Sequence, residues 1–307
     1  MAGTTKNLTV LMLNIGNDRR GRATDYGLHH RLGNIMMLMK GIAPGGRLIT
    51  QPDIVLMSEF RGCCYPRDPT RMLSSQELLA SFMNNTGYVG EYFPDNLLPE
   101  CMGCAIFYNP ERVMRYSATA LWPRPGEGRP YGYRPAGAQG CKGFSNFEFM
   151  LLDWCEVDPR DGSLLAGEPI NIVFGHAPMN QGRNDYLQAI AYYANDGQGS
   201  PLVCGDFNLI KELGGDDSRR LLQKQLFDHS EHLGETFVSF PYDTDKEGNL
   251  YRGALDFVGT SDSFPHEVTN VEVVPDPDQL ISDHLPIVIT IERNTTAPNT
   301  LSQLDIE

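Results

Sequence analysis

Short apolar runs that end in polar clusters are the feature that most constrains the fold of this chain. Residues 201–204 (Pro-Leu-Val-Cys) lead into Gly-Asp-Phe-Asn at 205–208, and Ser-Asp-His at 282–284 precedes the apolar run 287–291. Short apolar runs bounded by turn residues are typical of buried β-strands. We therefore expect both clusters at strand ends. A metal-assisted hydrolase needs such an arrangement, because it combines oxygen ligands for a hard cation with an imidazole.

Strand-like and helix-like segments alternate unevenly along the chain. Strands are predicted over residues 8–14, 53–58, 103–108, 112–118, 145–157, 169–175, 201–205, 254–259, 269–274 and 285–292. Apolar residues at helical spacing predict helices over 25–41, from Ser74 onward, over 184–194 and over 217–227. Many strands without a regular βαβ rhythm favour an α/β fold of the α+β type, a mixed sandwich rather than a doubly wound sheet.

The length of the chain allows one large domain or two small ones. The chain has 307 residues, 41% of them hydrophobic, which suffices for a large core, and no stretch reaches the length of a membrane span. We predict a single domain over 1–293 and a disordered, polar tail over 294–307. The N-terminus lacks the features of a signal peptide, so an intracellular protein is expected, with a monomer as the default state. Seven scattered cysteines, an odd number, indicate reduced thiols rather than a disulfide framework.

The net charge of −14 argues against a broad basic face for duplex nucleic acid. It leaves room for a nuclease, because an acidic cleft can bind phosphate through a cation. The charge therefore favours a small or locally recognised phosphoester.

Polar residues recur at the ends of strand-like runs, and together they predict one cleft. They are Asn14, Glu59, His176, Asp206, Asn208, Asp256, Asp283 and His284. Glu59 follows a strongly apolar run, and because carboxylates are rarely buried without a partner, we favour a metal ligand. Asp256 lies within an apolar strand and needs a partner, for which an imidazole is the natural choice.

Each of these positions also has a structural explanation when it is taken alone. Asn14 would then be a turn or cap residue, and His176 a hydrogen-bonded histidine of the core. Asp206 and Asn208 point the same way on an extended chain, but an Asx-turn is the alternative. The recurrence of such residues at several strand ends favours the common cleft.

The order of these residues resembles the DNase-I-like endonuclease/exonuclease/phosphatase superfamily. The resemblance spans about residues 8–292 and rests on Gly-Asp-x-Asn at 205–208 and Ser-Asp-His at 282–284, in the order and strand context of that family. It implies a four-layer sandwich, in which two packed mixed β-sheets are flanked by helices and the site lies at one edge of the sheets. It also implies a phosphoric-ester hydrolase that requires Mg²⁺ or Mn²⁺.

The resemblance further implies roles for individual residues. Glu59, with Asn14 and Asp283 close by, would hold the metal. Asp206 and Asn208 would orient the attacking water and the phosphate. His284, paired with Asp256, would act as general base or stabilise the transition state. His176 would bind a phosphate oxygen or assist the leaving group, and Asn14 would also contact substrate.

Arg183, at the start of a predicted helix, is either a further phosphate contact or a surface charge. Two predicted long loops, 60–72 and 122–143, carry arginines interleaved with aromatic residues, which suits phosphate contact and base stacking. A solvated basic loop is the alternative for both. We expect a phosphodiester partner, favouring single-stranded or terminal nucleic acid. A phospholipid or other small phosphoester is the second possibility, and a catalytically inert binding module the third.

Overall fold

The computed structural model describes residues 7–16, 28–62, 64–65, 68–94, 103–122, 132–133, 149–156, 170–177, 183–196, 200–210, 214–240 and 244–294. Most of the predicted tail therefore lies outside the described residues, as does most of the segment 122–143. Within the described part of the chain, no helix combines the length and the apolar character needed to cross a membrane.

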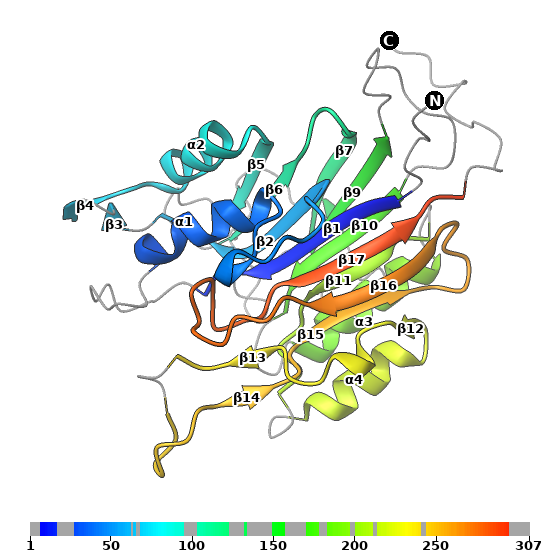
Figure 1. The fold of residues 1–307 in the computed structure, drawn as a ribbon. Coiled ribbons are helices and arrows are strands. Elements are labelled where there is room, and N and C mark those ends of the chain that lie inside the picture. Colours follow the sequence, from blue (N-terminus) through cyan, green and yellow to red (C-terminus); the bar gives the residue numbers. More distant parts are fainter. Residues whose placement is uncertain are drawn as a thin grey trace.

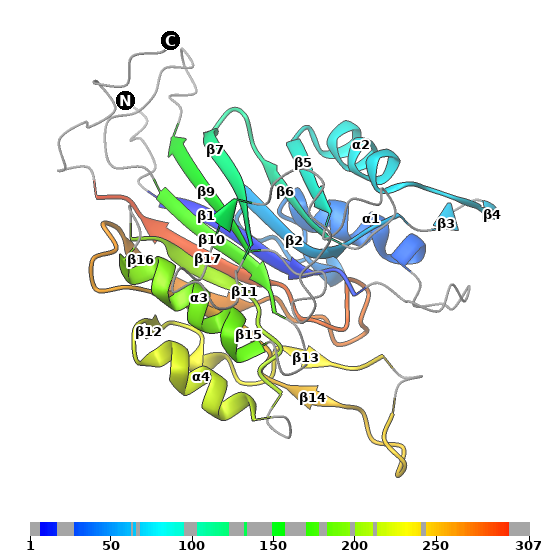
Figure 2. The same cartoon turned by 180° about the vertical axis from the view of Figure 1, so that it is seen from behind.

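Two mixed β-sheets form the centre of the protein (Figures 1 and 2). The first has the strand order β16-β17-β1-β2-β6-β5 and the second β12-β15-β11-β10-β9-β7-β8. The strands of the first sheet are β1 (Asn7–Asn14), β2 (Ile54–Phe60), β5 (Val89–Pro94), β6 (Gly103–Tyr108), β16 (Glu267–Val273) and β17 (Ile287–Glu292). Those of the second are β7 (Val113–Trp122), β8 (Gly132–Tyr133), β9 (Phe149–Glu156), β10 (Ile170–His176), β11 (Leu202–Asp206), β12 (Phe227–Asp228) and β15 (Asp256–Thr260).

Helices cover the outer faces of both sheets. They are α1 (Leu28–Met39), α2 (Ser75–Thr86), α3 (Arg183–Asp196) and α4 (Gly215–Gln223), with short 3₁₀ turns at Pro44–Gly46 (η1) and Glu231–Leu233 (η3). The beginning of α2 is fixed by a capping box, in which Ser74 and Glu77 each bond the other's backbone N–H. Two short ribbons complete the fold, β3 (Cys64–Tyr65) with β4 (Asp68–Met72) and β13 (Phe237–Val238) with β14 (Arg252–Gly253).

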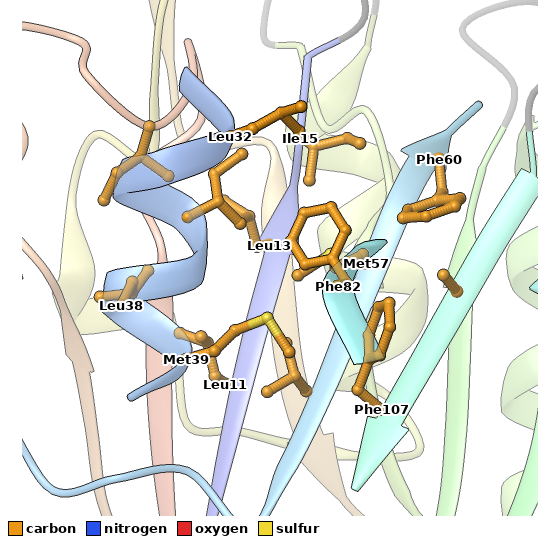
Figure 3. Packing of buried hydrophobic residues seen from close by; sticks show 14 of the residues in the cluster. Leu11, Leu13, Ile15, Leu32, Leu38, Met39, Met57, Phe60, Phe82 and Phe107 are labelled. Atoms are coloured by element: carbon orange, nitrogen blue, oxygen red, sulfur yellow. The ribbon is translucent and has the colours of Figure 1, made fainter. Parts of the chain in front are cut away.

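The alternation of side chains along the strands builds three separate cores. In β1, Val10 and Met12 belong to the core between the sheets, whereas Leu11 and Leu13 pack toward α1 and α2. Figure 3 shows this outer core, where Phe82 of α2 also packs. The third core lies between the second sheet and the helices α3 and α4. The four layers expected from the sequence are therefore confirmed: helices, sheet, sheet and helices.

Three expectations about individual segments were wrong. The segment 60–72, expected as a loop, contains the β3–β4 ribbon; β3 has only two residues, and β4 (Asp-Pro-Thr-Arg-Met) is too polar to have an apolar pattern. The strand β5 was not predicted, because its glycine and its proline break the pattern; a proline is tolerated there since β5 is an edge strand. The helix α4 ends at Gln223, so that Phe227 pairs with Thr260 as part of β12 instead of continuing the helix.

Candidate active site

The predicted polar residues meet at one edge of the two sheets. β1 and β2 are parallel, so Asn14 and Glu59 reach the same edge. β10 and β11 are parallel as well, and their last residues, His176 and Asp206, are paired. Asp206 is also paired with Asp256, the first residue of the antiparallel β15. The strand registers alone therefore gather residues that lie far apart in the sequence.

Asp206 is the centre of the hydrogen-bonded cluster and is almost fully buried. Its Oδ2 atom accepts a hydrogen bond of 2.8 Å from the amide of Asn14. The same oxygen lies 3.5 Å from Nε2 of His176 and 3.5 Å from Nε2 of His284. Its Oδ1 atom accepts the backbone N–H of Asn208 at 2.9 Å. With both oxygens engaged, the carboxylate has a fixed orientation.

The imidazole of His284 lies between two carboxylates. Its Nδ1 atom is 3.2 Å from Oδ2 of Asp256, while Nε2 faces Asp206. Burial by itself would lower the pKa of His284, but the charges of Asp206 and Asp256 outweigh it and raise the pKa to about 10. Burial raises the pKa of Asp256, and the charge of His284 opposes that rise. The imidazole of His284 therefore stays protonated to a higher pH than a free imidazole would.

Glu59 approaches the cluster from the first sheet. Its Oε1 atom lies 3.9 Å from Nε2 of His176, and its side chain is partly exposed. The backbone of Glu59 has a φ of 55°, a left-handed conformation that is rare for a residue with a side chain. The register between β2 and β6 shifts at this point, between Met57 and Phe60. The irregular backbone turns the Glu59 carboxylate toward the strand ends; such strain is frequent at functional sites.

Asp283 completes this side of the site. Burial raises the pKa of Asp283; the charge of His284 opposes that rise and the charge of Glu59 adds to it. Gly16 is what allows Asp283 to come so close to the end of β1. It has a φ of 53°, and a Cβ atom at this position would lie 2.2 Å from Oδ1 of Asp283. A side chain at position 16 would therefore displace Asp283.

Two groups of residues in the described part of the chain have the chemistry for a metal ion. Asp206, Asp256 and His284 have ligand atoms within 4.8 Å of one another. However, the His284 ring directs both nitrogens at carboxylates, and a protonated ring has no lone pair for a metal. Glu59 and Asp283 instead oppose each other as like charges, which a hard cation with oxygen ligands would neutralise. The carboxylates of Glu59 and Asp283 therefore also have the chemistry to hold a hard cation.

Asn208 and Arg183 lie behind the cluster. Asn208 has a φ of 50°, and its amide donates to the carbonyl of Ala177 at 2.7 Å. Its own carbonyl accepts a hydrogen bond of 2.7 Å from Arg183, whose guanidinium also donates to Ser218 at 3.1 Å. Arg183 is only 5% exposed, so it is no surface charge. These contacts orient the loop that carries Asn208; contact with a substrate phosphate stays a prediction.

Arg31 is a residue of the site that the sequence reasoning missed. It is buried in α1, and its guanidinium donates to the carbonyls of Ile15 (2.8 Å), Gly16 and Ile281. It also lies over the ring of Phe240, 5.1 Å from the centroid. Arg31 thus joins the end of β1 to the segment before Asp283, and its charge opposes the rise in the pKa of that aspartate. The available signal was a charged residue on the apolar face of a predicted helix.

The strand registers also place the ends of the two arginine-containing segments. Leu121 pairs with Phe149, which in turn pairs with Gly175, next to His176. The end of β7 at Trp122 therefore lies at the same edge as the site. The segment after β2 begins at this edge too, directly beyond Phe60.

Comparisons with known proteins give a consistent fold. No family model matches the sequence, and no curated protein matches it. Among solved structures, an endonuclease/exonuclease/phosphatase from Bacteroides vulgatus is 15% identical with a TM-score of 0.66, covering 94% of this chain and 99% of its own. A mannosyl-6-phosphatase from Bacteroides thetaiotaomicron is 15% identical with a TM-score of 0.60, covering 92% and 99%. D. rerio TDP2 complexed with a single-strand DNA product is 13% identical with a TM-score of 0.57, covering 93% and 98%.

These similarities extend over nearly the whole of both chains in each comparison. The protein therefore has the DNase-I-like fold of endonuclease/exonuclease/phosphatase proteins, as its sequence motifs had indicated.

Proposed function

We propose that the protein is a divalent-cation-dependent phosphoester hydrolase that acts on phosphodiesters, with nucleic acid ends or single strands as the favoured substrate. The observation that carries the proposal is the His284 imidazole held between Asp206 and Asp256, in a site where the like charges of Glu59 and Asp283 also repel each other. Such an arrangement suits attack of water on a phosphate, because fixed donors and charges can stabilise the charge that develops there.

His284 acts as a donor to the phosphate. Because both ring nitrogens face carboxylates, the ring carries two protons and is a cation rather than a base. Asp256 fixes its orientation through Nδ1. The Nε2–H group, which faces Asp206 here, would donate to a phosphoryl oxygen of the bound substrate and so stabilise the transition state. The sequence left two roles open for His284, general base and stabiliser of the transition state, and we favour the second.

Asp206 orients the attacking water. Its Oδ2 atom accepts a proton from the water as the bond between the water oxygen and phosphorus forms. The amide of Asn14 and the backbone of Asn208 hold the carboxylate in place for this step. His176, on the other side of Asp206, donates to a phosphate oxygen or to the leaving oxygen as the phosphorus–oxygen ester bond breaks.

Glu59 and Asp283, with Asn14 nearby, would hold Mg²⁺ or Mn²⁺. The cation would supply positive charge that neutralises the phosphate and polarises its oxygens. Every other element of the chemistry comes from the side chains of the chain itself.

The choice of nucleic acid rests on the surroundings of the site. Segments with interleaved arginines and aromatic residues start at the site edge, after Phe60 and after Trp122. Such segments suit a phosphate backbone with exposed bases. A structurally similar protein, TDP2, holds a single-strand DNA product, which favours the same class. The similar mannosyl-6-phosphatase keeps a small phosphoester as the second candidate.

Hydrolysis of bis-p-nitrophenyl phosphate with Mg²⁺ or Mn²⁺ tests the proposed chemistry. We expect turnover that EDTA abolishes and that added metal restores, with Asp206→Asn as the inactive control. No hydrolysis with either metal would favour the inert binding module. A panel of single-stranded oligonucleotides, phospholipids and sugar phosphates then separates the candidate substrates; activity on lipids or sugars alone would contradict the choice of nucleic acid.

A further inference from the structure

The β13–β14 ribbon is a continuation of the wall that carries His284. Val238 donates its backbone N–H to the carbonyl of Asp283 at 2.9 Å, and Leu285 donates to the carbonyl of Thr236 at 2.8 Å. Phe237 forms a β-bridge with His284 on one side and pairs with Gly253 on the other. The ribbon and the catalytic segment thus form one small three-stranded sheet, which projects from the site end of the molecule (Figure 1).

The parity of the strands decides which side chains share the face of His284. Residues directly opposite each other in an antiparallel pair lie on the same face, and the faces alternate along each strand. Phe237 therefore shares the face of His284, and the two rings are in contact, with centroids 5.0 Å apart. One row further out, Ser239 donates its backbone N–H to the carbonyl of Tyr251 at 2.8 Å, and Tyr251 donates its backbone N–H to Oγ of Ser239 at 2.9 Å. The alternation of faces then assigns Tyr251 to the side of Phe237.

This face combines two aromatic side chains with small residues between them. Gly253 carries no side chain beside Phe237, and a Cβ atom there would meet only the side chain of Leu255. Ser239 is small and buried, whereas Tyr251 is 50% exposed. Diagonal neighbours across an antiparallel pair are about 7–8 Å apart, which aromatic side chains can span. Phe237 and Tyr251 therefore lie within reach of one planar group beside the imidazole that would donate to the phosphate.

We propose that Tyr251, with Phe237, binds a nucleobase carried by the group that stays on the phosphate when the ester is cleaved, and so selects nucleotide esters over esters whose retained group is aliphatic. This inference rests on the proposed phosphodiesterase function and names the substrate group that the site selects. Stacking is suited to the task because every base offers a flat face, so that the contact selects an aromatic group without reading a sequence.

Two esters with the same leaving group test the inference. The p-nitrophenyl ester of thymidine 5′-phosphate carries a base, and methyl p-nitrophenyl phosphate carries none; both release p-nitrophenolate. We expect Tyr251→Ala to raise KM for the thymidine ester roughly 5- to 100-fold, the usual effect of losing one stacked base, with KM for the methyl ester unchanged. Tyr251→Phe, which keeps the ring, should retain the KM of the wild-type protein for both.

The control variant is Phe227→Ala. Phe227 is also an exposed aromatic residue, 65% exposed, but it pairs with Thr260 at the end of β15 opposite to Asp256. Its loss should leave both esters unaffected. Equal weakening of both esters by Tyr251→Ala, or no weakening of either, would overturn the inference while the proposed hydrolase stands. If the wild-type protein with Mg²⁺ or Mn²⁺ cleaves neither ester, the proposed function fails and the inference falls with it.

Discussion

Asp206 and His284 face each other through Oδ2 and Nε2 at a distance of 3.5 Å, although 78 positions separate them in the sequence (284 − 206 = 78). Neither residue is more than 5% exposed. Their contact joins the two sheets at the site, since Asp206 ends a strand of the second sheet and His284 precedes a strand of the first.

Removal of either partner should stop catalysis while the fold persists. We expect His284→Ala and Asp206→Asn each to reduce kcat by at least ~10²-fold, because each removes a group that acts on the reacting atoms. Steady-state kinetics on bis-p-nitrophenyl phosphate measures the loss, with circular dichroism as the check on folding. A folded variant with nearly wild-type kcat would refute the role of the residue concerned.

The position of the metal is open to a direct binding measurement. Glu59→Gln should weaken Mn²⁺ binding at least ~10-fold, because it removes the charge of a ligand. Asp256→Asn should leave the affinity for Mn²⁺ nearly unchanged, since Asp256 serves the imidazole. Titration calorimetry on both variants measures the two Mn²⁺ affinities. The opposite ranking would place the ion among Asp206, Asp256 and His284.

The raised pKa of His284 predicts how the stability of the metal-free protein depends on pH. The folded pKa of about 10 exceeds the ordinary value of about 6.5, so the folded state retains a proton that the unfolded state has lost between these two values. The stabilisation from this ring is complete below about pH 6.5 and is lost as the pH rises toward 10. Urea unfolding in EDTA should show a steeper decline in the free energy of unfolding for wild type than for His284→Gln. Parallel declines would contradict the assignment.

Arg31 should matter for stability and for the metal side of the site. Arg31→Met leaves buried carbonyls of Ile15, Gly16 and Ile281 without their donor, and we expect a loss of about 3 kcal/mol in the free energy of unfolding. Arg31→Lys keeps the charge but not the planar fork of donors, so its loss should be smaller. Urea unfolding measures both.

Arg220→Met is the matched control, because Arg220 forms an exposed pair with Asp217 and should contribute little. Mn²⁺ affinity should fall in Arg31→Met but not in Arg220→Met. An Arg31→Met protein as stable as wild type would show that the guanidinium does not hold the two segments together.

The strand pattern predicted a mixed sandwich, and the family resemblance of the polar motifs implied its four layers. The polar residues at strand ends also prove to be neighbours. This succeeded because strand ends of known direction meet at one edge, as Asn14 and Glu59 do. The two-residue strands β13 and β14 escaped prediction, since so short a segment has no periodicity. The contact of Phe237 with His284 was hidden for the same reason.

Arg31 and Arg183 show a second reason why the sequence could not predict the whole site. Both sit in predicted helices, but their partners are carbonyls of distant segments, such as Ile281, which lies 250 positions from Arg31. Every residue has a backbone carbonyl, so the sequence does not indicate which carbonyls will accept hydrogen bonds from a buried guanidinium. Only the packing of α1 and α3 against the sheets determines those partners.

The position of β1 between β17 and β2 has a consequence for biosynthesis. β1 (Asn7–Asn14) is synthesised long before its antiparallel partner β17 (Ile287–Glu292). Until β17 is made, one edge of β1 is unpaired and open to wrong strand pairing. The segment with Asp283 and His284 is also absent at that stage. The cluster around Asp206 is therefore complete only after the segment that leads into β17 has been made.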